Sequence, residues 1–120
     1  MDGIAGKRVL LVEDEAILAM SVEDMLHDLG CVVIGPALSK DDAQRLATEA
    51  ELDAAVLDIN LGDGDSGVIA EILMRRGVPF CFSTGYGTAG VPEGFSGVPV
   101  LAKPYTSSSL STALQQLLAS

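Results

Sequence analysis

Five short runs of apolar residues recur along this 120-residue chain, and segments with helical periodicity separate them. Each run has about the length of a typical strand, and strands that are apolar throughout are buried on both faces. Such strands alternating with helices are typical of a parallel sheet whose crossover helices cover both faces. The predicted strands are residues 9–12, 32–34, 54–57, 80–82 and 98–101.

Four segments predict amphipathic helices. Residues 39–42 and 106–109 have the pattern of helix starts, and Gly30 is placed to end a helix in a left-handed conformation. Arg75 and Arg76 complement the helix dipole in the last turn before Gly77. The apolar positions of the four helices are Leu18, Val22, Met25, Leu26 and Leu29; Leu46 and Ala50; Val68, Ile69, Ile72 and Leu73; and Leu110, Ala113, Leu114, Leu117 and Leu118.

A fifth helix, between the fourth and fifth strands, is expected to be weak, short or absent. Each glycine costs a helix about 1 kcal/mol relative to alanine, and proline costs more. The stretch contains Gly85, Gly87, Gly90, Pro92, Gly94 and Gly97.

Length and charge restrict the class of protein. Residues 1–120 are enough for one hydrophobic core but not two, so one domain is expected. The net charge of -10 repels phosphate backbones and anionic lipids, which argues against nucleic acid or a membrane as partner. Residues 1–6 form a polar lead without a signal sequence. Cys31 and Cys81 lie in apolar runs without metal-binding spacing, which indicates buried free thiols in a reducing cytoplasm.

Polar side chains follow four of the predicted strands. Ligands of an open parallel sheet bind beyond the carboxyl ends of its strands, where the strand order reverses. If the order is 2-1-3-4-5, Asp14 and Asp58 converge there, and their repulsion calls for a hard cation such as Mg²⁺. The alternative is a solvated acidic rim of helix-capping carboxylates, which is the interpretation for Glu15. The polar residues are Glu13, Asp14, Glu15, Asp58, Ser83, Thr84 and Lys103.

Asp58 leaves a buried strand directly into a glycine-rich loop. A carboxylate there is partly desolvated yet reachable, and with a cation it can attack phosphorus and form an aspartyl phosphate. The alternative is an Asp that only initiates a turn. A calcium loop of the EF-hand type is excluded, because Gly62 and Asp63 stand in the reverse of the required order.

Lys103 is the only basic residue after Arg76 and ends an apolar strand. Its ammonium can pair with Asp58, or with a phosphoryl oxygen once Asp58 is modified. Thr84 offers a hydroxyl to the same oxygen. The alternatives are an ordinary surface lysine and an unremarkable hydroxyl at a strand end.

Together these residues resemble a response-regulator receiver domain of two-component systems. Residues 9–15 (VLLVEDE), residues 56–61 (VLDINL) and the pair Lys103 and Pro104 carry the resemblance, which covers nearly the whole chain. It implies a flavodoxin-like, doubly wound five-stranded parallel sheet of order 2-1-3-4-5.

The resemblance also implies roles for the site residues. Asp58 would be the phosphoacceptor, with Lys103 and Thr84 holding the phosphoryl group. The Mg²⁺ ligands would be Asp14, Asp58 and the Asn60 backbone carbonyl, with Glu13 acting through water. The peptide before Pro104 would be cis.

Two positions depart from the family pattern. The aromatic residue usual three positions before the lysine is Val100 here, so the usual aromatic-coupled switch is in doubt. Residues 79–85 (PFCFSTG) resemble a single-domain subgroup with the motif Phe-Ala-Thr-Gly, with Ser83 in place of the alanine. That subgroup is associated with histidine kinases of the HWE type.

The favoured hypothesis is a cytoplasmic signalling switch. A histidine kinase or histidine phosphotransfer protein would donate to Asp58, and the domain would catalyse only its own phosphorylation and dephosphorylation. The alternatives are a small Mg²⁺-dependent phosphatase of the haloacid-dehalogenase kind, which needs an acid where Asn60 stands, and a flavodoxin-like module that binds an anionic cofactor.

Overall fold

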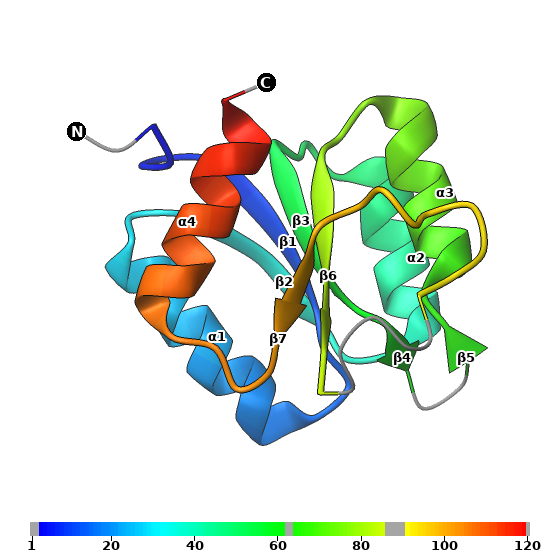
Figure 1. Ribbon diagram of the computed structural model, residues 1–120, viewed down its shortest axis with the longest axis horizontal. Helices are drawn as coiled ribbons and strands as arrows, with labels where there is room; N and C mark the ends of the chain where they lie inside the picture. The colour runs from blue at the N-terminus through cyan, green and yellow to red at the C-terminus, as the bar shows by residue number, and fades with distance from the viewer. Residues whose placement is uncertain (1–2, 62–63, 86–90, 120) are drawn as a thin grey trace.

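A computed structural model describes residues 3–61, 64–85 and 91–119, and a five-stranded sheet forms its centre (Figure 1). All pairings within this sheet are parallel, so the predicted α/β fold and strand order are confirmed. A small antiparallel hairpin, β4 (Asn60–Leu61) with β5 (Gly64–Asp65), follows the central strand and was not predicted. The sheet order is β2 (Val32–Ala37), β1 (Arg8–Val12), β3 (Ala54–Asp58), β6 (Phe80–Thr84) and β7 (Val100–Ala102).

Helices cover both faces of the sheet (Figure 1). Helices α1 (Ala16–Asp28) and α4 (Ser107–Leu118) pack on one face, and α2 (Lys40–Glu49) and α3 (Gly67–Arg76) pack on the other. Alternate residues of a strand point to opposite faces, so Leu10 joins the α2/α3 core while Leu11 joins the α1/α4 core. The central strands β1, β3 and β6 are buried along nearly all of their length, whereas the edge strands β2 and β7 are partly exposed.

The helix boundaries follow the predicted signals. The Ser39 hydroxyl accepts a hydrogen bond from the backbone N–H of Asp42 at 3.2 Å, and Thr106 and Ser109 form a reciprocal capping box at the start of α4. Gly77 ends α3 in the left-handed conformation, with φ of 73°. Side-chain capping therefore marks the starts of α2 and α4, and Gly77 marks the end of α3.

Three expectations need correction. Residues 1–6 are not simply a polar lead, because Ile4 is fully buried against the α1/α4 core. Strand β7 begins at Val100 and not at residue 98. Val68 faces solvent, with 41% of its surface exposed, because the buried stripe of α3 is formed by Ile69, Ala70 and Leu73.

The segment between β6 and β7 has no helix in its described residues, 91–99, as the glycine content predicts; residues 86–90 lie outside the described part. Phe95 covers the sheet in place of a helix. Its ring lies 6.2 Å from the rings of both Phe80 and Phe82, in edge-to-face arrangements. Val100, at the position where the resembled family has an aromatic residue, packs partly buried against this cluster.

None of the described helices has the length and apolar character that crossing a membrane requires.

Candidate functional site

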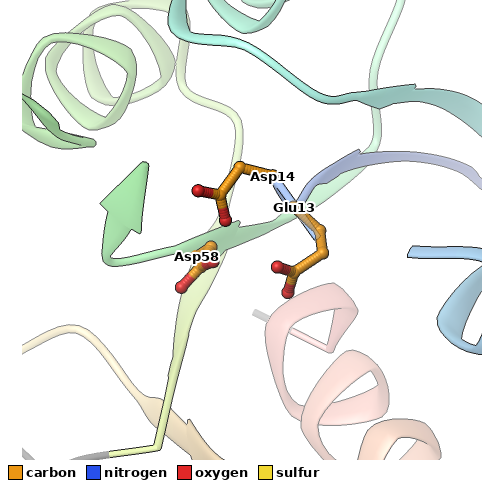
Figure 2. A group of neighbouring side chains, drawn as sticks. All are labelled: Glu13, Asp14 and Asp58. Atoms are coloured by element: carbon orange, nitrogen blue, oxygen red, sulfur yellow. The ribbon is translucent and has the colours of Figure 1, made fainter. Parts of the chain in front are cut away.

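Three carboxylates converge at the carboxyl ends of β1 and β3. Parallel pairing places Val12 beside Leu57, so the next residues at the two strand ends, Glu13 and Asp58, lie side by side. With Asp14 they bring carboxylate oxygens within 4.8 Å of one another (Figure 2). Glu13 and Asp58 are nearly inaccessible, with 1% and 6% of their surfaces exposed, while Asp14 is half-buried. The expected convergence of Asp14 and Asp58 is confirmed.

Lys103 reaches this cluster from the end of β7. Its Nζ lies 2.8 Å from Glu13 Oε1 and 3.2 Å from Asp58 Oδ2. The backbone N–H of Lys103 donates to the carbonyl of Thr84 at 2.8 Å, which holds the two strand ends together. The Lys103–Pro104 peptide is cis, as predicted. The pair with Asp58 was expected, but the shorter pair with Glu13 was not.

The electrostatics of the cluster favour a cation. Burial and, after it, the negative charge of Glu13 raise the pKa of Asp58, the Lys103 charge opposes the rise, and the net result is a pKa of about 7. Burial acts to lower the pKa of Lys103, but its pairing with Glu13 and Asp58 outweighs this, and its pKa is raised. One ammonium facing three carboxylates leaves the cluster with an excess of negative charge. An oxygen-rich set of this kind fits a hard divalent cation such as Mg²⁺.

An open cavity of about 400 Å³ lies above the carboxylates. The predicted site residues other than Glu13 reach this cavity, whereas Glu13 lies buried beside Asp58. Glu15 also borders the cavity; it stands at the N-cap position of α1 but makes no side-chain capping bond. The lining residues are Asp14, Glu15, Asp58, Asn60, Thr84, Gly85 and Lys103.

The backbone after Asp58 is held by two neighbouring elements. The N–H of buried Ile59 donates to the carbonyl of Ser83 at 3.1 Å, and the carbonyl of Ile59 accepts from the N–H of Ser66 at 3.0 Å. Ser66 immediately precedes α3. Sequence reasoning missed this support; a small polar residue directly before a predicted helix is the signal that could have indicated it.

Burial also raises the pKa of two groups outside the acidic cluster, one in β6 and one after β7. Burial raises the pKa of the Cys81 thiol to about 12, and it raises the pKa of Tyr105, whose hydroxyl hydrogen-bonds with Ser83. Cys31 and Cys81 are both free and buried, as predicted. Neither thiol belongs to the acidic cluster.

Comparisons with known proteins agree with this geometry. No family model matches the chain. The phyllosphere-induced regulator PhyR of Methylorubrum extorquens is 34% identical over 119 residues, which cover 92% of this chain but only 43% of that protein. The chain thus spans less than half the length of this curated relative.

Two solved structures have the same fold over nearly their whole length. The REC domain of the Erythrobacter litoralis response regulator PhyR is 30% identical with a TM-score of 0.79, covering 96% of this chain and 92% of that one. The receiver domain of the sensor histidine kinase PA1611 from Pseudomonas aeruginosa is 27% identical with a TM-score of 0.80, covering 97% and 100%. That structure has a magnesium ion coordinated in its active-site cleft.

Proposed function

Because this chain belongs to the receiver domains of response regulators, we propose that Asp58 accepts a phosphoryl group from a protein histidine in a Mg²⁺-dependent reaction. Receiver domains are signalling regulators, and the change at Asp58 would alter which protein this chain binds. The observation that supports this most is the buried Asp58 carboxylate, which borders an open cavity and faces both an acidic cluster and one ammonium.

The transfer is a substitution at phosphorus. An oxygen of Asp58 forms the new P–O bond while the P–N bond to the donor imidazole breaks, and the bonding electron pair leaves with the imidazole nitrogen. Lys103 would pair with a phosphoryl oxygen, and the Thr84 hydroxyl would donate to the same oxygen. Asp58 is buried on the sheet side and open on the cavity side, so it can be approached in line from the cavity only.

The metal would be held by Asp14, Asp58 and the backbone carbonyl of Asn60, with Glu13 acting through water. Bound Mg²⁺ supplies positive charge that offsets the carboxylates and the incoming phosphoryl oxygens. The donor would be a histidine kinase, of the HWE type by the subgroup resemblance, or a histidine phosphotransfer protein. The net charge of -10 supports a protein partner over nucleic acid or a lipid surface.

The test is a titration with Mg²⁺ and beryllofluoride, a phosphoryl mimic, followed by two-dimensional NMR. Amide resonances around the cavity should shift in the wild type, and Asp58→Asn should abolish the shifts, since the anionic carboxylate that binds beryllium is lost. Asp28→Asn is the matched control, because this exposed carboxylate lies at the end of α1 far from the cavity. An unchanged response in Asp58→Asn would refute the assignment of Asp58. Turnover of a generic phosphate ester would instead favour the phosphatase alternative.

A further inference from the structure

The buried carboxylate of Glu13 is fixed at both of its oxygens. Oε1 lies 2.8 Å from Lys103 Nζ, and Oε2 accepts a hydrogen bond from the backbone N–H of Glu15 at 3.1 Å. The backbone N–H of Glu13 itself donates to the carbonyl of Ala37 at 3.0 Å, which ties this residue to β2. Each carboxylate oxygen of Glu13 therefore has a partner other than Asp58.

Glu13 is also the nearer partner of Lys103, since the Lys103 to Asp58 distance is 3.2 Å. Lys103 has 13% of its side chain exposed, so an ammonium without a carboxylate partner would be costly there. When Asp58 takes up a phosphoryl group, one of its oxygens becomes the bridging oxygen of an acyl phosphate, and its pairing with Lys103 has to change. Glu13 is not modified, so its contact with Lys103 can persist through the reaction.

We propose that Glu13 is a positioning residue for Lys103: its side chain holds the ammonium at the cavity floor before and after Asp58 is phosphorylated. This role rests on the proposed function and is separate from any contribution of the Glu13 charge to metal binding. For this role the Glu13 side chain must be long enough for its carboxylate to contact the Lys103 ammonium. An aspartate here would keep the charge but would withdraw the carboxylate by roughly 1.5 Å, the length of one C–C bond.

Two substitutions separate reach from charge. Glu13→Asp keeps the charge and shortens the side chain, whereas Glu13→Gln keeps the length and a carbonyl oxygen that can accept from the ammonium but removes the charge. If Glu13 positions Lys103, the aspartate variant should lose the fixed ammonium, and its Mg²⁺ affinity should fall less than that of the glutamine variant because the charge is kept. The glutamine variant should bind Mg²⁺ about tenfold more weakly and keep the ammonium partly in place.

The fixed ammonium can be followed without any phosphorylation. A lysine NH₃⁺ group held by buried carboxylates exchanges its protons with water slowly, and ¹⁵N NMR of metal-free protein detects it. Lys103→Met identifies the Lys103 resonance. We expect the resonance in the wild type, its loss in Glu13→Asp and a weakened signal in Glu13→Gln. Phosphorylation by acetyl phosphate at saturating Mg²⁺ should be about tenfold slower in Glu13→Asp than in the wild type.

The opposite pattern overturns the inference. If Glu13→Asp matches the wild type in ammonium exchange and phosphorylation rate while Glu13→Gln loses both, Glu13 acts by its charge alone. Failure of the proposed function looks different: wild-type protein would then show no response to beryllofluoride, whatever the state of the Lys103 ammonium. Amide NMR checks that both variants fold. If only one of them folds, its Lys103 ammonium signal alone tests the inference, because each variant has its own expected outcome.

Discussion

Leu114 in α4 and Glu13 after β1 are buried to nearly the same extent, with 0% and 1% of their surfaces exposed. Burial of Leu114 removes apolar surface from water and stabilises the fold. Burial of Glu13 removes a charge from water, and this is tolerated because Lys103 and a backbone N–H compensate it. Burial therefore stabilises the core, whereas at the carboxyl edge of the same sheet burial of charged groups lowers the stability of the fold.

The largest expected effect tests the core. Leu114→Ala should lower the free energy of unfolding by about 3 kcal/mol, because it leaves a cavity between α4 and the sheet. Urea denaturation of metal-free protein measures this. Gln115→Ala, on the exposed side of the same helix, is the control and should change stability by less than about 0.5 kcal/mol. A cost below about 1 kcal/mol for Leu114→Ala would mean that α4 is not a full part of the core.

A smaller loss of stability is expected where residues 91–99, and not a helix, cover the core. Phe95→Ala should cost about 2 kcal/mol, less than for a fully buried Phe, because Phe95 is only half-buried while contacting Phe80 and Phe82. The same urea experiment measures it, with exposed Ser96→Ala as the control. If Phe95→Ala is as neutral as Ser96→Ala, the Phe95 ring does not stabilise the α2/α3 core.

The smallest effect has the opposite sign and tests the carboxyl edge. In metal-free protein, Asp58→Asn should increase the free energy of unfolding at pH 8 by about 1 kcal/mol, because it removes a charge that burial and Glu13 disfavour, while the lost Lys103 pair offsets part of the gain. Among the residues that the structure describes, Glu13, Asp14 and Lys103 are the charged groups that face Asp58.

The pH dependence follows from the raised pKa. Below the ordinary Asp pKa of 3.8, both folded and unfolded chains are protonated at Asp58, so the substitution should be neutral there. As pH rises, the unfolded chain loses this proton first, and stability falls until pH passes about 7. The gain from Asp58→Asn should therefore grow between these pH values and reach a plateau. Thermal unfolding across this range, without metal, would contradict the idea if the variant were less stable at pH 8.

Much of the fold follows from local patterns. Apolar runs predict the strands and a parallel sheet, whereas the strand order came from the family resemblance. Ser39, Thr106 and Gly77 mark helix ends because their effects act within one turn. The patterns do not predict that Ile4 lies in the core or that Phe95 packs on β6. Both are isolated apolar residues in polar or glycine-rich stretches, which show no periodicity.

The candidate site divides in the same way. The sequence by itself determined which residues stand at strand ends, because parallel strands finish at one edge. With the strand order that the family resemblance implies, it also predicted that Asp14, Asp58 and Lys103 converge. Only the tertiary structure decided that Lys103 lies closer to Glu13 than to Asp58, and that Ile59 is held by Ser83 and Ser66. Such pairings depend on side-chain reach and on distances between strand ends, which differ by fractions of an ångström that no residue pattern encodes.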